Sequence, residues 1–381
     1  MLTCLVNGRI HAPGDVIENG AIVVEDQVIR QVGPRDAISI PQSARILDAR
    51  GTLVVPGFID MHIHGVMGAD AMKGQALAMA QALPRFGVTG FLPTTVAAPS
   101  DELHGALRQI AQAKSASLQG AAILGIHMEG PYLSVRHPGA MEAKYFRPFN
   151  WLEFQGFVSA SENNVRMMTL APEVPPALDY LPRLVAMGIV PSIGHSHATF
   201  AQVQAAVKAG LRNASHVYNA MRPFHHREAG TVGAVLFSDD ITAELIADGV
   251  HVDATAMKLL LRVKGAGRIA LVSDALPVAG LPVGEYRWAG ESVFNDGKVA
   301  KLPGDRLAGS VTMLDGGLRH LVELAGVPFP EALACASSVP ARLLGLNTGS
   351  LEAGKDADVV LLDERFGVLL TMVKGQVVFE V

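Results

Sequence analysis

Residues 53–65 have the sequence LVVPGFIDMHIHG, an apolar run that ends in two histidines one residue apart, His62 and His64. Short, nearly continuous apolar runs are typical of strands that are buried on both faces, as in parallel sheets. Side chains two positions apart on a strand point to the same side, so both imidazoles can reach one ion at the strand end. The stretch predicts a buried strand that ends in two metal ligands, and the alternative is an ordinary pair of strand-end histidines.

Seven further apolar runs follow, and amphipathic helical patterns lie between many of them. With the first run at 54–64, the others occupy residues 88–95, 122–130, 165–173, 188–197, 211–220, 242–251 and 268–275. Helical patterns cover 76–86, 101–113, 178–188 and 199–210, with two more near 312–325 and 329–343. Eight such strands predict a parallel (β/α)8 barrel, because the alternative doubly wound α/β fold usually needs fewer strands. An NDG turn within 285–302 predicts a hairpin inserted after the eighth strand.

The two ends of the chain resemble each other and differ from the middle. Both consist of short β-rich segments broken by NG, RG or KG pairs, and neither end alone is long enough to bury a core. We therefore predict a small β-sandwich domain built from residues 1–54 and 350–381. The barrel, residues 55–349, is then inserted between its two halves.

Composition and charge exclude several classes of protein. The net charge of −5 is spread along the 381 residues, so we expect neither a nucleic-acid partner nor an anionic membrane partner. Only Cys4 and Cys335 are present, which excludes a disulfide framework and fits the reducing cytoplasm. The N-terminus does not have the pattern of a signal peptide, and no apolar run reaches the roughly 18 residues of a membrane span. We expect a soluble cytoplasmic protein.

Residues that bind metals collect at the carboxyl ends of the predicted strands, where catalytic groups of α/β barrels lie. They are His62, His64, Glu129, His195, His216, His251 and Asp274. Taken singly, each could be a loop or capping residue. His127 lies on the same face as Glu129. In the GHSH motif, His195 and His197 are two positions apart, so either of them could be the ligand.

This set of side chains suits one or two divalent ions, since zinc, iron and manganese all accept imidazole and carboxylate ligands. An ion with three or four protein ligands keeps a position for water and lowers the pKa of that water toward about 7. Asp274 is then placed to accept the proton and to return it to a leaving amine. Its alternative role as a helix cap is weakened because the following ALPVAGLPVG is not helical. We predict hydrolysis of an amide, ester or similar carbonyl.

The order HxH, Glu, His, His, Asp within a barrel flanked by terminal strands resembles the amidohydrolase superfamily. The motifs PGFIDMHIHG, GIHMEGPYL, IGHSHA, ASHVYNAM, REAG, IADGVHVD and LVSDA together resemble its N-acetylglucosamine-6-phosphate deacetylase family. The resemblance covers essentially the whole chain. It implies a metal-dependent enzyme of amino-sugar catabolism that removes acetate from N-acetyl-D-glucosamine 6-phosphate. The run 165–173 has no lysine to bridge two ions, and Glu129 takes that place as in this deacetylase family.

The resemblance also implies roles for single residues. It implies a main metal site at Glu129, His195 and His216, a second ion supported by His62 and His64, and an acid–base role for Asp274. Zn²⁺ is expected first, with Fe²⁺ or Mn²⁺ as alternatives. The implied substrate contacts are Ala140, Asn219, Ala220, Arg227, His251, Leu307, Ala308 and Gly309. Arg227 would reach the phosphate of a phosphosugar bound to the neighbouring subunit, which implies a homodimer.

One position departs from the family pattern. In RHPGAM, residues 136–141, Gly139 and Ala140 fit, but Met141 stands where many members have a histidine that contacts the sugar. Methionine cannot donate a strong hydrogen bond to a hydroxyl. The alternative substrates are therefore N-acetylgalactosamine 6-phosphate or a non-phosphorylated N-acyl compound. A scaffold that has lost catalysis is a further alternative, against which the complete set of ligand positions argues.

Overall fold

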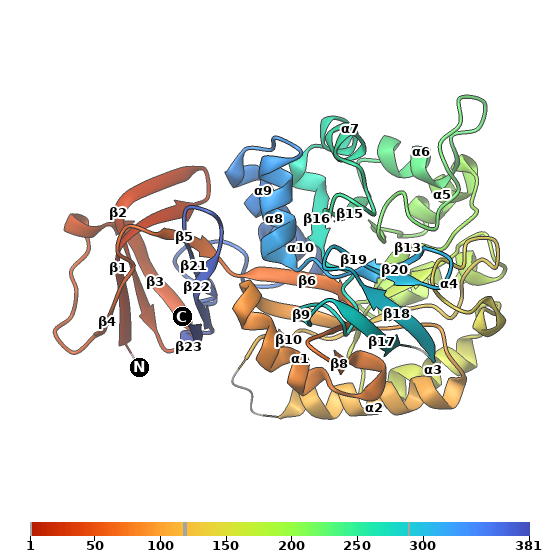
Figure 1. Ribbon diagram of the computed structural model, residues 1–381, viewed down its shortest axis with the longest axis horizontal. Coiled ribbons are helices and arrows are strands. Elements are labelled where there is room, and N and C mark those ends of the chain that lie inside the picture. Colours follow the sequence, from red (N-terminus) through yellow and green to blue (C-terminus); the bar gives the residue numbers. More distant parts are fainter. Residues whose placement is uncertain (1, 117–119, 289) are drawn as a thin grey trace.

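The computed structural model describes residues 2–116, 120–288 and 290–381. Two parts lie side by side along the longest axis, a sheet made from both ends of the chain and a larger α/β part (Figure 1). Both ends of the chain lie in or beside the sheet part (Figure 1).

The terminal sheet has eight strands in the order β23-β22-β21-β5-β1-β2-β3, with β4 beside β1. They are β1 (Leu2–Ala12), β2 (Asp15–Glu25), β3 (Val28–Pro34), β4 (Arg45–Asp48), β5 (Leu53–Pro56), β21 (Val359–Leu362), β22 (Val368–Val373) and β23 (Gln376–Glu380). The two ends of the chain join where β5 pairs antiparallel with β21, with Val55 opposite Val360. Buried residues of both halves, such as Ile22 and Leu361, belong to one core. The predicted small β domain from both termini is confirmed, whereas its limits at residues 54 and 350 stay a prediction.

The α/β part is built on eight parallel strands that follow one another around a barrel. They are β6 (Phe58–Ile63), β9 (Val88–Thr95), β11 (Ile126–Glu129), β12 (Val165–Leu170), β13 (Val190–Ile193), β14 (Asn213–Ala214), β15 (Thr242–Ile246) and β16 (Ile269–Val272). A short ninth strand, β10 (Ala122–Ile123), precedes β11 and pairs with Gly90 and Phe91 of β9. The first and last strands meet where Ile63 pairs with Ala275. The predicted (β/α)8 barrel is confirmed.

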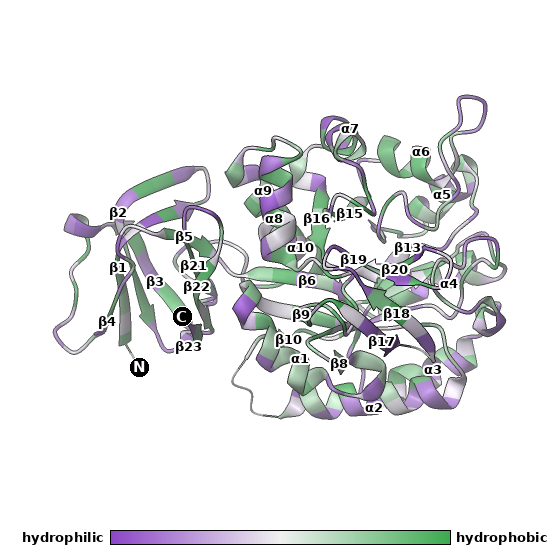
Figure 2. Ribbon diagram, viewed as in Figure 1, coloured by the Kyte–Doolittle hydropathy of each residue, from purple (hydrophilic) through white to green (hydrophobic). Residues whose placement is uncertain are grey.

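Helices surround the barrel. They are α1 (Ala76–Ala82), α2 (Ser100–Ser115), α3 (Trp151–Ala160), α4 (Ala177–Ala186), α5 (Phe200–Lys208), α6 (Gly230–Phe237), α7 (Ala254–Lys264), α8 (Leu314–Glu323), α9 (Phe329–Ala336) and α10 (Ser338–Leu344). Helix α2 alternates hydrophilic and hydrophobic residues, whereas β6 is mostly hydrophobic (Figure 2). This difference matches a barrel core of apolar strands covered by amphipathic helices.

One predicted helix, near 329–343, is two helices in the structure. Ser337 interrupts it with φ −134° and ψ −76°, outside the helical region. Pro340 lies in the first turn of α10, where the missing N–H is tolerated, whereas inside one long helix it would break a hydrogen bond. The prediction of a single helix was therefore wrong.

The insertion after β16 is a four-stranded antiparallel sheet, larger than the predicted hairpin. Its strands are β17 (Gly284–Trp288), β18 (Glu291–Asn295), β19 (Val299–Leu302) and β20 (Arg306–Ser310). The NDG turn joins β18 to β19 as predicted, but β17 and β20 flank this pair. Ser310 donates its N–H to the carbonyl of Asp274 at 3.1 Å, which fixes the insertion to the barrel mouth. A shorter hairpin, β7 (Gly65–Val66) and β8 (Ala69–Asp70), follows β6 directly.

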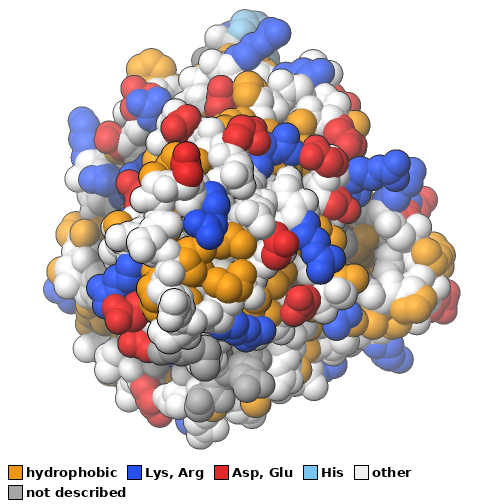
Figure 3. Space-filling model, turned by 90° about the vertical axis from the view of Figure 1, so that its left-hand side faces the viewer, with side chains coloured by type: hydrophobic (Ala, Val, Ile, Leu, Met, Phe, Trp, Pro, Cys, Tyr) orange, Lys and Arg blue, Asp and Glu red, His pale blue; other side chains and the backbone are white. Residues whose placement is uncertain are grey.

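The outer face of the terminal sheet has basic and acidic side chains interspersed around an apolar area (Figure 3). In the part of the chain that the structure describes, no helix has both the length and the apolarity that crossing a membrane requires.

Candidate metal centre and active site

Glu129, at the end of β11, lies between two pairs of histidines. Its Oε1 lies 3.0 Å from Nε2 of His195 and 2.8 Å from Nε2 of His216. Its Oε2 lies 3.3 Å from Nε2 of His64 and 3.5 Å from Nε2 of His62. Donor atoms that share one ion at about 2.1 Å are themselves roughly 3 to 3.4 Å apart. One carboxylate therefore has the position of a bridge between two ion sites.

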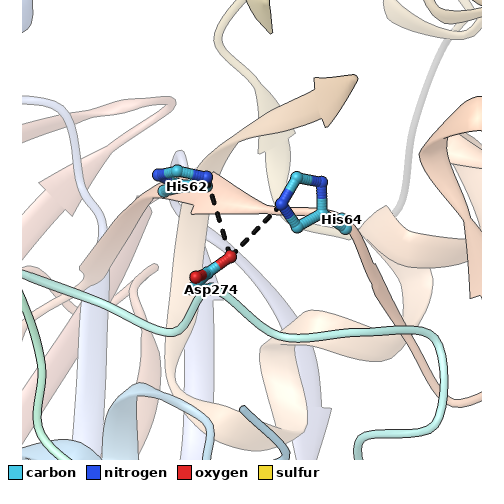
Figure 4. A group of neighbouring side chains, drawn as sticks. All are labelled: His62, His64 and Asp274. Carbon is cyan, nitrogen blue, oxygen red and sulfur yellow. Dashed lines mark ion pairs between the residues drawn. The ribbon is translucent and has the colours of Figure 1, made fainter. Parts of the chain in front are cut away.

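Asp274 approaches the cluster from the end of β16. Its Oδ1 lies 3.2 Å from Nε2 of His64 and 3.6 Å from Nε2 of His62 (Figure 4). Two groups of side chains have donor atoms that all lie within 4.8 Å of one another inside the group. One consists of His62, His64 and Asp274, and the other of His62, Glu129 and His216. All of these side chains are buried except that of Asp274, which is 15% exposed.

Three residues of the cluster have left-handed backbone conformations. The φ angles are 45° at His195, 31° at His216 and 47° at Asp274. Each of the three is the second residue after the end of a barrel strand. Left-handed φ is costly for residues other than glycine and occurs preferentially at functional sites. Three of the side chains that meet in the cluster are therefore carried by strained backbone.

The protonation of two histidine rings of the cluster is determined by hydrogen bonds of Nδ1, the nitrogen that points away from Glu129. Nδ1 of His195 donates to the carbonyl of His137 at 2.8 Å, and Nδ1 of His64 to that of Thr94 at 3.1 Å. Because a carbonyl can only accept, Nδ1 carries the proton in both rings. Nε2 of each neutral ring then presents a lone pair to the cluster, as in metal-binding histidines.

Burial and charge act against each other on the histidines of the cluster. Burial lowers the pKa of His62, but the carboxylates of Glu129, Asp274 and Glu244 outweigh it and raise the pKa well above its ordinary value. Burial likewise lowers the pKa of His64, and its contacts with Asp274 and Glu129 raise it to about 9. The carboxylates therefore create a strong demand for positive charge at this point.

The carboxylates respond in the opposite direction. Burial raises the pKa of Glu129, but His62 and the hydrogen bonds from His195 and His216 hold it well below its usual range. Burial also raises the pKa of Asp274, and His62 and His64 lower it to about 2. Nε2 of His62 is buried without a hydrogen-bond partner. Imidazole and carboxylate donors around an unpartnered buried nitrogen fit a divalent cation.

A cavity of about 240 Å³ opens in front of the cluster. The residues named from the sequence that line it are His64, Glu129, Ala140, His195, His216, Asn219, Ala220, His251, Asp274, Leu307 and Ala308. His62 is fully buried and lies behind its wall. Gly309 lies behind Asp274, since a Cβ there would come 2.8 Å from Leu276 and 3.1 Å from the Asp274 carbonyl.

Arg227 is not among the residues that line this cavity. It lies on the exposed segment between Met221 and α6, where its Nη1 contacts Nε2 of His226 at 2.9 Å. The neighbouring Glu228 pairs with Arg222 at 2.6 Å and leaves Arg227 outside that ion pair.

The two additional histidines that the sequence offered lie outside the metal cluster. His127 donates through Nδ1 to the carbonyl of Met61, and burial lowers its pKa to about 3. Nδ1 of His197 contacts Nε2 of His137 at 2.8 Å. Of the GHSH pair, it is His195 that faces Glu129.

Sequence reasoning missed Glu244, Trp288 and Arg306. Glu244 is fully buried and contacts His62, and its signal was a charged residue inside the apolar run TAELI. Trp288 and Arg306 line the cavity from the four-stranded insertion, far along the chain from most of the cluster. No local pattern marked these two residues, because their position depends on how the insertion folds over the barrel mouth.

Comparison with known proteins places the chain in a family. The model of the amidohydrolase family matches residues 53–378. This chain belongs to the amidohydrolase family. This amidohydrolase is 35% identical to the N-acetylglucosamine-6-phosphate deacetylase of Bacillus subtilis, over 96% of this chain and 94% of that one. It is 39% identical to the N-acetylgalactosamine-6-phosphate deacetylase of Escherichia coli O157:H7, over 94% and 95%.

Solved structures of the same family agree with this assignment. N-acetyl-D-glucosamine-6-phosphate deacetylase from Mycobacterium smegmatis, in complex with N-acetyl-D-glucosamine-6-phosphate, has a TM-score of 0.91 and 32% identity, with 99% of each chain covered. The deacetylase of Thermotoga maritima has a TM-score of 0.90 and 34% identity over both whole chains. This amidohydrolase is thus an enzyme of the deacetylase type, with a barrel and terminal sheet like those of its relatives.

Proposed function

We propose that this amidohydrolase removes acetate from N-acetyl-D-glucosamine 6-phosphate, giving D-glucosamine 6-phosphate, a step of amino-sugar catabolism. The observation that supports it is the position of Glu129, which contacts four histidines, and of Asp274, which contacts two of them, in the wall of one cavity. Relatives at 35% identity and more that act on N-acetylhexosamine 6-phosphates support the substrate class.

Glu129, His195 and His216 would hold one divalent ion, and His62 and His64 would support a second. When bound, such an ion lowers the pKa of water and polarises the acetyl carbonyl. Zn²⁺ is our first choice for this set of nitrogen and oxygen donors, and Fe²⁺ and Mn²⁺ are also compatible with it.

Asp274 moves the proton in this proposal. With a pKa of about 2 its carboxylate is ionised at neutral pH, so it can accept a proton from the attacking water. It is also the most exposed of the cluster side chains, so it can reach the amide nitrogen and return the proton to the leaving amine. The acetyl group would lie beside Leu307, Ala308 and Gly309 of β20, the strand whose last residue, Ser310, donates its N–H to the carbonyl of Asp274.

The sugar would be held by Ala140, Asn219, Ala220 and His251. Nδ1 of His251 lies 2.6 Å from Oδ2 of Asp248, whose carboxylate also accepts two backbone N–H groups. This carboxylate fixes the proton on Nδ1 and leaves Nε2 of His251 for the substrate. Asp248 therefore has a positioning role toward a cavity residue.

The phosphate would be bound across a homodimer. Arg227 lies on an exposed segment outside its own cavity, where it could reach the cavity of a second copy. Its planar guanidinium can donate two parallel hydrogen bonds to a phosphate. We place the enzyme in the cytoplasm, since both of its cysteines are free and buried.

N-acetylgalactosamine 6-phosphate is the second candidate substrate. Met141 lines the cavity, and its Sδ accepts the N–H of Ala97 at 3.3 Å, so this side chain offers the sugar no donor. The relative from Escherichia coli O157:H7 is named for the galactosamine compound.

The decisive experiment is acetate release from both N-acetylhexosamines, each with and without 6-phosphate. We expect the highest kcat/KM for N-acetylglucosamine 6-phosphate and a loss of at least about tenfold without phosphate, the effect of roughly 1.4 kcal/mol. Equal rates with and without phosphate would contradict the phosphosugar assignment, and faster turnover of the galactosamine compound would favour the second candidate.

A further inference from the structure

A ring of hydrogen-bonded side chains, closed by the backbone between Met61 and His62, lies inside the barrel beneath the metal cluster. It connects six strands through side chains that are all fully buried. In order around the barrel, its members are His62, Glu244, Asn213, Ser192, Ser215, Thr169 and His127, and the ring returns to β6 at the carbonyl of Met61. None of these contacts is longer than 3.0 Å.

From Ser192 to Met61, the hydrogen bonds can be donated in one direction only. Because the carbonyl of Met61 can only accept, Nδ1 of His127 donates to it at 3.0 Å. A neutral His127 then accepts at Nε2 from the hydroxyl of Thr169, 2.7 Å away. Thr169 must in turn accept from Ser215, and Ser215 from Ser192, each at 2.7 Å.

The remaining part of the ring is the carboxylate of Glu244 with its hydrogen-bond donors. Asn213 donates through Nδ2 to Ser192 at 2.9 Å and to Oε1 of Glu244 at 2.7 Å. Oε2 of Glu244 accepts the backbone N–H of His216 at 3.2 Å and lies 2.8 Å from Nδ1 of His62. Every partner of this carboxylate is a donor, so Nδ1 of His62 carries a proton.

The proton that Glu244 holds on Nδ1 decides what His62 presents to the cluster. With its proton on Nδ1, the neutral ring has a lone pair on Nε2, the buried atom without a hydrogen-bond partner. That lone pair faces Glu129 at 3.5 Å and Asp274 at 3.6 Å. A cation, either a proton or a metal ion, is needed between this nitrogen and the two carboxylate oxygens.

We propose that Glu244 is a positioning residue for a second metal ion, which it prepares by fixing the tautomer and orientation of His62. Carboxylates behind metal-binding histidines raise the basicity of the ligand and hold its ring. Glu244 also adds a third negative charge to those of Glu129 and Asp274. One divalent ion leaves this set of three carboxylates negative, whereas two ions outweigh it. The inference rests on the metal dependence proposed above.

The test counts metal ions in the purified enzyme and does not use the substrate. Wild type, Glu244→Gln and His62→Gln are stripped, refilled with Zn²⁺ and titrated against a chromophoric chelator. We expect two equivalents in wild type. In both variants one equivalent should stay tight, and the other should weaken by about 10- to 100-fold. The double variant should lose no more affinity for the second ion than His62→Gln alone, because both changes act on the same ligand.

Asp248→Asn is the matched control. It removes the same charge from the other buried carboxylate–histidine pair, whose Asp248 Oδ2 and His251 Nδ1 lie 2.6 Å apart. Because neither residue belongs to the two groups of donor atoms, this variant should keep both equivalents.

Two outcomes overturn the proposal, namely a single equivalent in wild type or unchanged affinity for both ions in Glu244→Gln. If Glu244→Gln does not fold, Asn213→Ala replaces it, since it removes one donor to Glu244 and keeps the charge. Unchanged affinity for the second ion in that variant also overturns the proposal. Failure of the substrate assignment would appear only in acetate release, so the two failures are distinguishable.

Discussion

The backbone N–H of Asp274 donates to the carbonyl oxygen of His62 at 2.9 Å. This hydrogen bond belongs to the seam between β16 and β6, where the barrel closes with Ile63 opposite Ala275. The same two residues bring Oδ1 of Asp274 to 3.6 Å from Nε2 of His62. Closure of the barrel therefore determines the distance between the proposed acid–base residue and a proposed metal ligand.

Replacing Asp274 by asparagine should separate catalysis from metal binding. The variant keeps the shape of the side chain and loses the proton acceptor, so we expect kcat to fall by about 10²- to 10⁴-fold. The site at Glu129, His195 and His216 does not include Asp274 and should keep its ion. Acetate release and metal analysis on the same preparation check this, and a parallel loss of the tight ion would contradict the proton-transfer role.

Metal affinity should increase with pH. In the metal-free cluster the pKa of His64 is raised to about 9, so between about pH 6.5 and 9 an ion must displace its proton. We expect the affinity of the ion at His64 to rise about tenfold per pH unit for each proton displaced. Calorimetric titration with the metal at pH 6, 7 and 8, in buffers of different ionisation enthalpy, measures the affinity and the number of protons released. A pH-independent affinity without proton release would refute the displacement of a proton from His64.

The same shift predicts how the metal-free enzyme responds to pH. Because the folded pKa of His64 lies above the unfolded value of 6.5, its contribution to stability is complete below about pH 6.5 and is lost as the pH rises through about 9. We expect the urea midpoint of metal-free protein to fall between these two pH values. His64→Gln should show a smaller fall over the same interval, and an identical fall in both proteins would assign the effect elsewhere.

Gly139→Ala should disturb the main metal site. Gly139 has φ +58°, and a Cβ there would lie 2.9 Å from Cε1 of His195. The displaced ring should weaken the tight ion, with a loss of activity of about 10- to 100-fold. Gly14→Ala is the control, since Gly14 has φ +74° and open space around its Cβ. Both variants should lose about 1–2 kcal/mol of stability from left-handed backbone, and only Gly139→Ala should release metal.

Arg227→Ala tests the proposed phosphate contact across the dimer. We expect KM for a 6-phosphorylated substrate to rise by about 10- to 100-fold, since a charge-assisted hydrogen bond contributes roughly 1.5–3 kcal/mol. Turnover of the non-phosphorylated sugar should not change. Arg30→Ala is the control, because Arg30 pairs with Glu25 in the terminal sheet. An unchanged KM for the phosphorylated sugar would exclude this role of Arg227.

The barrel strands could be predicted because each is a local pattern. The run 88–95 coincides with β9, since eight consecutive buried residues need no information from elsewhere in the chain. The candidate ligands could be predicted for the same reason, as they follow directly on such runs. The run 211–220 corresponds to the two-residue strand β14, and the left-handed φ of His216 just beyond it has no signal in the apolar pattern.

Features that depend on long-range contacts escaped prediction. Glu244 became significant only when β15 came next to β14 and opposite His62. Trp288 and Arg306 entered the cavity wall because β20 joins the backbone of Asp274. The break at Ser337 likewise depends on the backbone angles of that residue, whereas the sequence pattern of 329–343 is continuous.

The pairing of β5 with β21 has a consequence for synthesis on the ribosome. Val55 is made early, but its partner Val360 is made only after all eight strands of the barrel. Until then one side of β5 is an open edge, which could pair with other nascent chains. The barrel strands are therefore made while the sheet is still incomplete, and the last strands of the chain complete it.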